Sequence, residues 1–302
     1  MARIIQPENR DRNVGTILVV SSAVASSAKA IFVKLAYAYR VDPITLLALR
    51  MAFAMPFFLG TALWSHRRTD TTRLSRRDQI TLLILGCVGY YLASTLDFIG
   101  LKYISAGLER LMLFLYPTLV VVLSALLFRR PVRRQETVAM ALSYAGILLV
   151  FLREAGGGAI FTGGALVFAS ALAYAVFLVG SGHMIQRLGA TRFTALTMIV
   201  AGLACIAQFL VTRPLRALAL PAAVYILALA MALLSTVVPA FLLSAGIRRI
   251  GPRRAALLGF AGPISTILLA WIFLGEPLTA AKIAGTGLVL AGMLQLRAAD
   301  TN

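Results

Sequence analysis

Long apolar runs alternate with short, arginine-rich polar segments along the whole chain of 302 residues. A helix needs about 20 apolar residues to cross about 30 Å of hydrocarbon, and ten stretches approach or exceed that length. The predicted spans cover residues 14–37, 43–64, 79–99, 104–128, 135–152, 160–185, 193–212, 221–245, 253–274 and 280–297. The pattern therefore predicts an all-α integral membrane protein with ten transmembrane helices.

The connections between the predicted spans are too short to hold a soluble domain. We expect a short segment at residues 1–13, one half of five spans at 14–152, a second half at 160–297 and a tail at 298–302. The apolar run that begins at Val14 continues past Ala28-Lys29-Ala30, so we interpret it as an uncleaved first helix rather than a signal peptide.

Composition agrees with a lipid environment. The chain is 60% hydrophobic and only 13% charged, whereas soluble proteins are about 45–50% apolar and about 25% charged. The net charge of +18 would suit a nucleic-acid-binding protein, but the arginines lie in short runs between apolar segments rather than on one basic face. We therefore expect the lipid bilayer, and no nucleic acid, as a partner.

The distribution of basic residues gives an orientation. With the amino terminus in the cytoplasm, 19 basic residues fall on the inner side and six on the outer side. Because cytoplasmic loops carry the excess of lysine and arginine, we expect both termini in the cytoplasm of a multi-pass protein of the cell inner membrane. A missed span would reverse every later loop and spoil this bias.

The two halves of the chain resemble each other. A shift of 146 residues, without a gap, aligns ten identical positions between residues 101 and 148, and a shift of 148 aligns the first spans. Most of the weight rests on Pro117 with Pro263, Pro131 with Pro277 and Gly146 with Gly292. Further matches are Gly100 with Gly246, Ile104 with Ile250, Gly15 with Gly163, and Ser22 with Ser170. Since each half has an odd number of spans, the second half must enter the membrane upside down, as in the inverted repeats of many secondary transporters.

These features resemble the drug/metabolite transporter superfamily, and specifically its EamA-type family of two five-helix repeats. The sharpest local match is Trp271-Ile-Phe-Leu-Gly-Glu-Pro-Leu-Thr279, followed by Gly285 and Gly292. The first repeat departs from the pattern, because Arg130-Pro131 stands where Glu-Pro is usual. The resemblance implies a proton-linked or facilitative carrier or exporter of metabolites such as amino acids.

Ionisable side chains inside spans are costly and mark candidate functional sites. Six are present, and their positions along the helices place all of them in the outer half of the membrane: Lys29, Lys34, Arg50, Asp97, Glu109 and Arg110. Two interpretations stay open. In one, a paired network at the outer mouth of a central cavity is formed by Lys29, Arg50, Asp97, Glu109 and Arg110; in the other, the ordinary span-end groups that reach to the interface are Lys34, Asp97, Glu109 and Arg110. Four positive groups against two negative ones favour a substrate with a carboxylate, and Asp97 or Glu109 could carry a coupling proton.

If the family fold holds, spans one, three, four, six, eight and nine line the cavity. The substrate-binding candidates there are Lys29, Arg50, Tyr90, Tyr91, Ser94, Asp97, Glu109, Arg110, Tyr116, Tyr174, Ser235 and Phe260, with Ser22, Ser26 and Phe241 as further polar or aromatic wall residues. Helix packing is the alternative role for each of the tyrosines and serines. Pro117, Pro239 and Pro263 are candidate kinks or hinges, because proline removes a helix hydrogen bond.

The predicted function is a secondary transporter, in the export direction, of small metabolites such as amino acids or related carboxylate-bearing compounds, by alternating access. A flippase for a lipid-linked substrate is the alternative, and a membrane-embedded enzyme is the weaker one. The cysteines and histidines show no metal-ligand or catalytic spacing, so we predict no enzyme, no catalytic residue, no metal and no cofactor. A small-molecule substrate is the expected partner, and the sequence fits a monomer or a homodimer.

Overall fold

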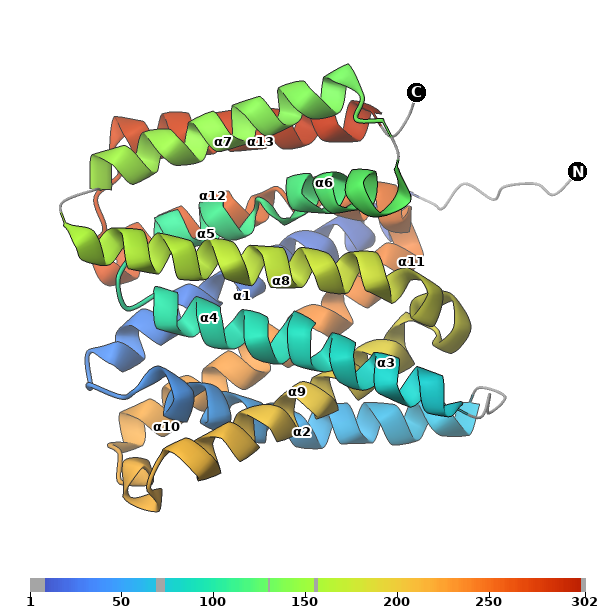
Figure 1. Cartoon of the computed structure of the whole chain (residues 1–302), viewed down its shortest axis with the longest axis vertical. Helices are drawn as coiled ribbons and strands as arrows, with labels where there is room; N and C mark the ends of the chain where they lie inside the picture. The colour runs from blue at the N-terminus through green and yellow to red at the C-terminus, as the bar shows by residue number, and fades with distance from the viewer. Residues whose placement is uncertain (1–8, 69–73, 130, 155–156, 300–302) are drawn as a thin grey trace, which may run out of the picture.

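The computed structural model describes residues 9–68, 74–129, 131–154 and 157–299, and every regular element in these ranges is helical. The first repeat contains α1 (Asn9–Tyr37), α2 (Pro43–Arg68), α3 (Arg76–Gly86), a π-helical segment (Cys87–Leu92), α4 (Ala93–Gly100), α5 (Ala106–Leu113), α6 (Tyr116–Phe128) and α7 (Arg134–Glu154). The second contains α8 (Gly158–Leu188), α9 (Ala190–Thr212), a 3-10 turn (Leu215–Leu218), α10 (Ala222–Ala232), a π-helical segment (Leu233–Val237), α11 (Val238–Leu258), α12 (Ala261–Leu274) and α13 (Ala280–Ala299). Figure 1 shows them as one bundle with both chain ends on the same side.

Eight helical stretches among the described residues are long and apolar enough to cross a membrane, and two shorter apolar helices, Ala261–Leu274 and Ala280–Leu296, occupy the positions of the ninth and tenth predicted spans. Large apolar side chains such as Leu126, Phe128 and Val211 are 72%, 70% and 85% exposed. Exposed apolar side chains in such number mark a contact surface, and on helices of this length and hydropathy that contact is with lipid. The prediction of an all-helical, multi-pass membrane protein is confirmed.

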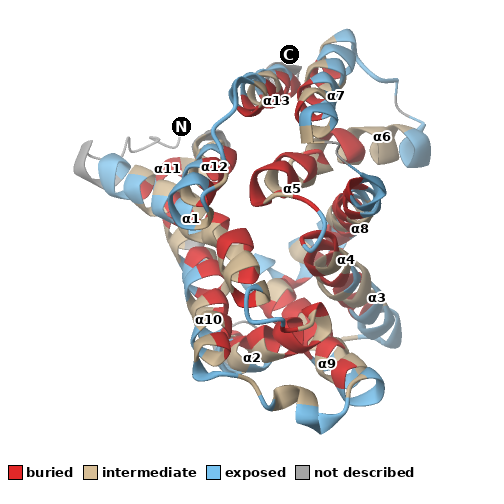
Figure 2. Cartoon of the chain, turned by 90° about the vertical axis from the view of Figure 1, so that its left-hand side faces the viewer, coloured by how far each residue is buried: buried red, intermediate tan, exposed pale blue. Residues whose placement is uncertain are grey.

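The side of the bundle that carries both chain ends is called the terminal side below, and the opposite side is called the far side. Figure 2 views the bundle from the far side and shows buried positions wherever helices face one another. Helix α5 lies toward the middle of this view, and six of its eight residues are buried. It contacts α1, α7, α8, α12 and α13, so it joins both repeats.

The internal repeat is visible in the irregularities of the helices. The π-helical segments begin at Cys87 and Leu233, which are 146 residues apart. The fourth span is interrupted at Phe114–Leu115 and the ninth at Gly259–Phe260. Pro117 stands in the first turn of α6, just after the first interruption. Pro263 stands near the start of α12 after the second, and Pro239 follows the second π-helical segment.

Matched glycines hold two symmetry-related helix pairs together. A Cβ on Gly15 of α1 would lie 2.5 Å from Ile250 Cγ2, and one on Gly163 of α8 would lie 2.8 Å from Ile104 Cγ2. Gly246 and Gly100 face the same two crossings, at 2.4 Å from Val19 Cγ2 and 2.6 Å from Val167 Cγ2. Small residues at such positions let membrane helices approach closely. The glycines matched in the sequence are therefore the contact points of α1 with α11 and of α8 with α4.

A matched pair of serines fastens the same crossings. Ser22 Oγ donates to the carbonyl of Pro239 at 2.8 Å, and Ser170 Oγ donates to the carbonyl of Ala93 at 2.7 Å. Each hydroxyl thus satisfies a backbone oxygen beside a π-helical segment in the partner span. Bilayer-buried backbone groups need such partners, so these serines stabilise the two crossings in equivalent ways.

We expect the α7–α13 crossing to be sensitive to one added methyl group. A Cβ on Gly146 would lie 2.5 Å from the carbonyl oxygen of Gly285, whereas a Cβ on Gly287 of α13 would meet nothing within 4 Å. Overpacking of this kind costs about 1–3 kcal/mol, while Gly→Ala in an open helical position stabilises by about 0.5–1 kcal/mol. Gly146→Ala should lower the apparent melting temperature in detergent, and Gly287→Ala should leave it equal or higher; equal melting of the two variants would contradict this packing.

Candidate functional site

A central cavity of two adjoining lobes lies between the two repeats. The first, called the charged lobe, has a volume of about 410 Å³, and the second has about 310 Å³. Both lobes share Ser22, Ser26, Arg50, Tyr90, Ser94, Tyr174 and Leu243. Lys29, Asp97, Arg110 and Tyr116 line the charged lobe alone, and Thr194, Ser235, Thr236 and Pro239 line the second lobe alone.

The cavity extends along much of the membrane-spanning length. Asp97 lies three residues before the far-side end of α4, which is about 5 Å at a rise of 1.5 Å per residue. Thr194 lies four residues after α9 begins on the terminal side, which is about 6 Å. The charged groups therefore stand at the far-side end of the cavity, and the lining continues toward the terminal side.

An ion-pair cluster closes the far-side end of the charged lobe. Lys29 Nζ of α1 donates to Asp97 Oδ2 of α4 at 2.5 Å and lies 3.1 Å from Glu109 Oε1 of α5. The side chains of Asp97 and Glu109 are 3% and 0% exposed, and that of Lys29 is 16% exposed. Because a carboxylate in a low-dielectric site is costly without a counter-charge, these contacts draw α1, α4 and α5 together.

Two guanidinium groups face the cavity without a carboxylate. Arg50 donates from Nε and Nη2 to Thr236 Oγ1 at 3.2 and 3.0 Å and lies over the ring of Phe98 at 5.5 Å. Arg110 donates to Ser27 Oγ at 3.5 Å and lies over the ring of Phe114 at 5.3 Å. Among the described residues neither arginine forms an ion pair, and Arg110 Nε is buried without a hydrogen-bond partner. A guanidinium group without an ion-pair partner can donate two parallel hydrogen bonds to the carboxylate of a ligand.

Aromatic rings form another part of the cavity wall. Tyr90 contacts Phe177 edge-to-face with 4.9 Å between ring centroids, and Tyr116 contacts Tyr174 in the same manner at 5.4 Å. Tyr90 and Thr236 are repeat mates, 146 residues apart, and each stands on a π-helical segment. Such segments turn side chains away from the regular helical phase and occur often at functional sites. This part of the wall is therefore apolar with hydroxyl groups.

Most of the residues chosen from the sequence meet around this cavity, but not all. Tyr91 packs into the neighbouring core, and Phe241 is 54% exposed. Glu109 stands behind Lys29 rather than in the wall, and Phe260, Pro117 and Pro263 are not among the lining residues. The sequence pattern does not indicate Thr236, whose hydroxyl oxygen accepts both hydrogen bonds of Arg50. Arg130, the departure from the Glu-Pro pattern, lies outside the described residues.

Comparison with known proteins decides the family. The sequence pattern described as the EamA-like transporter family matches residues 13–152 and again residues 161–297. The chain belongs to the EamA-like transporter family. The resemblance seen in the sequence is thereby confirmed, together with the architecture of two repeats.

Curated relatives of this EamA-like chain carry transporter names. The uncharacterized transporter YcbK of Bacillus subtilis is 31% identical over 302 residues, which covers 95% of each protein. Protein PecM of Dickeya dadantii is 26% identical over 230 residues, covering 70% of this chain and 72% of PecM. A protein of known crystal structure shares the fold with a TM-score of 0.65 at 18% identity, over 93% of this chain and 97% of the other. This EamA-like chain is thus a membrane transporter, and the chemistry of its cavity must be argued from its own residues.

Proposed function

We propose that this protein is a secondary carrier that exports small metabolites bearing a carboxylate, such as amino acids, by alternating access. The observation that supports the substrate class is a pair of guanidinium groups that face the charged lobe. In the part of the chain that the structure describes, Arg50 and Arg110 have no carboxylate partner. With Lys29, Asp97 and Glu109 the cavity end has three cationic and two anionic side chains. One substrate carboxylate would balance this charge.

The size and polarity of the cavity support a small substrate. A volume of about 410 Å³ in the charged lobe lies within the range of small-molecule sites, which combine apolar walls with a few polar groups. Tyr116 and Tyr174 offer an apolar surface for the body of the ligand, and Ser26 and Ser94 offer hydroxyl groups for a second polar substituent. An amino acid with a medium-sized side chain has this combination of features.

A ligand screen by thermal shift tests the substrate class. A ligand at 100 times its dissociation constant stabilises the folded protein by about 2.7 kcal/mol, so amino acids and organic acids should raise the melting temperature and polyamines and nucleosides should not. Arg110→Gln should weaken binding of the active compound about 10- to 100-fold, because a hydrogen bond to a charged group contributes about 1.5–3 kcal/mol.

The matched control is Arg213→Gln, since Arg213 pairs with Asp42 at 3.0 Å on the far side and does not line the cavity. It should leave the affinity unchanged. A consistent preference for cationic compounds would disprove the carboxylate assignment. Stabilisation by lipid-linked compounds alone would support a flippase instead.

The carrier is further proposed to lie in the inner membrane with both termini in the cytoplasm. The excess of arginine in the loops of the terminal side supports this orientation. A cavity that extends toward the terminal side would then receive its ligand from the cytoplasm, as export requires. Green fluorescent protein fused to the carboxyl terminus should fluoresce, and alkaline phosphatase at the same point should be inactive; the reverse pair of results would invert the topology.

Protons are the coupling ion that the site supports best. Asp97 and Glu109 share the ammonium group of Lys29, so one of them can exchange a proton as the ligand enters or leaves. In proteoliposomes, an imposed pH gradient should drive net transport by the parent protein. Glu109→Gln should keep exchange of labelled for unlabelled ligand but lose the response to the gradient, whereas an undiminished response would exclude Glu109 as the proton carrier.

A further inference from the structure

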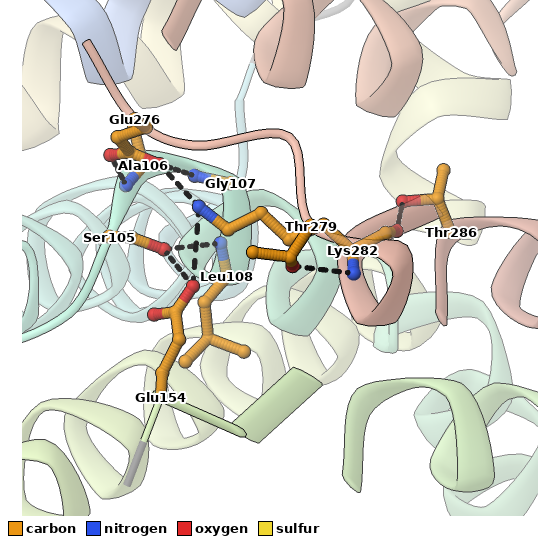
Figure 3. A network of polar contacts seen from close by, with 9 residues as sticks. All are labelled: Ser105, Ala106, Gly107, Leu108, Glu154, Glu276, Thr279, Lys282 and Thr286. Carbon is orange, nitrogen blue, oxygen red and sulfur yellow. Dashed lines mark hydrogen bonds and ion pairs between the residues drawn. The ribbon is translucent and has the colours of Figure 1, made fainter. Parts of the chain in front are cut away.

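A second polar network lies on the far side, outside the central cavity (Figure 3). Its centre is Glu276, in the link between α12 and α13. Glu276 Oε1 accepts a hydrogen bond from the backbone N–H of Ala106 at 2.7 Å, and Oε2 accepts from that of Gly107 at 3.3 Å. Lys282 Nζ of α13 lies 3.0 Å from Glu276 Oε2. A carboxylate of the second repeat therefore caps the first turn of α5 in the first repeat.

The end of α7 joins the same network. Ser105 Oγ accepts from the backbone N–H of Leu108 at 3.1 Å and donates to Glu154 Oε1 at 2.8 Å, and Lys282 Nζ lies 3.3 Å from the same carboxylate oxygen. The first N–H groups of a helix have no partner within the helix, and the partial positive charge there favours an anion. The start of α5 is thus held by groups from three other segments.

Helix α5 is a short segment that is not continuous with the helix that follows it. It has eight residues, Ala106–Leu113, and the break at Phe114–Leu115 separates it from α6. Glu109 stands in its first turn and meets Lys29, and Arg110 stands in its last turn and lines the charged lobe. A rotation or shift of α5 would move both charged groups together, and the cap at its start opposes such a movement.

We propose that Glu276 is a positioning residue that holds α5 across the far-side end of the cavity, and that release of this cap opens the charged lobe to the far side. The inference rests on the proposed alternating-access function. The structure offers room for the release, because a cavity of about 750 Å³ lined by Leu149, Arg153 and Lys282 adjoins the network. Glu276, Glu154 and Lys282 can therefore separate without disrupting a packed core.

The test measures from which side a cavity cysteine is accessible. The reporter is Ala23→Cys, a wall position of the charged lobe, in a chain whose Cys87 and Cys205 are replaced by serine and alanine. A membrane-impermeant maleimide is applied to right-side-out and to inside-out vesicles. The parent should react chiefly from the terminal side. In Glu276→Ala the far-side rate should rise about fivefold, since loss of a helix cap costs about 1 kcal/mol.

Three further variants separate the cap from the ion pair. Glu276→Gln keeps an acceptor for the N–H groups of α5, so its rate should lie between those of the parent and Glu276→Ala. Lys282→Met leaves the carboxylate in place and should also have a smaller effect. Exchange of the charges, Glu276→Lys with Lys282→Glu, keeps an ion pair but removes the acceptor from the start of α5, so it should react as fast from the far side as Glu276→Ala.

The matched control is Asp42→Ala, which removes a far-side carboxylate that accepts from the backbone N–H groups of Ile44 and Thr45 and pairs with Arg213 at 3.0 Å. This contact joins α2 to the end of α9, and its loss should leave the labelling pattern unchanged.

An unaltered far-side rate in Glu276→Ala, or recovery of the parent rate by the charge exchange, would overturn the proposal. Should Glu276→Ala not fold, Glu276→Gln decides, because a rate equal to the parent's would also overturn it. Labelling needs no ligand, so failure here leaves the carboxylate-carrier proposal standing, and failure of the ligand screen leaves the labelling result intact.

Discussion

The contact of one ammonium group with two carboxylates inside the membrane constrains the rest of the far-side half of this protein. Asp97 and Glu109 are almost fully buried, and among the described residues only Lys29 offers each a neutralising charge within 3.1 Å. Because an uncompensated charge in a low-dielectric site costs several kcal/mol, α1, α4 and α5 must meet at this point. Their meeting closes the cavity at the far side and leaves the two guanidinium groups of Arg50 and Arg110 facing the space that remains.

The backbone scaffold is symmetric, but its chemistry is not. The glycine and serine contacts of α1 with α11 recur in those of α8 with α4. The charges do not recur, since the repeat mates of Lys29 and Asp97 are Phe177 and Leu243. The matched packing residues therefore give the two repeats similar helix crossings. The charged side chains that line the cavity come from the first repeat, and they make the far-side end of the cavity different from its terminal-side end.

The sequence was sufficient for those features that depend on length or on repetition. Apolar runs predicted the spans, and matched glycines and prolines predicted the repeat. Depth along a helix placed Lys29, Asp97 and Glu109 in one half of the membrane, but it could not assign their partners, because pairing depends on how three helices are rotated. Tyr91 was chosen beside Tyr90 although adjacent helical residues point about 100° apart, and Thr236 was missed because a π-helical segment sets its direction. The cap made by Glu276 joins residues 170 positions apart, and no local pattern indicates such a contact.

Two parts of the cavity wall respond to different forces in the cycle that we propose. The aromatic part contains Tyr90 and Tyr174, whose contacts with each other and with the buried Phe177 depend on ring packing and change little with charge. At the far side, Glu109 and Arg110 share the short helix α5, whose start is capped by Glu276. A ligand carboxylate at Arg110 would add a negative charge close to Glu109, and a proton that then enters at Glu109 would remove the ion pair by which Lys29 holds α5. Ligand binding, proton uptake and release of the Glu276 cap would then all act on α5. A change of charge in the cavity could in this way open the far side of the cavity and leave the terminal side unchanged.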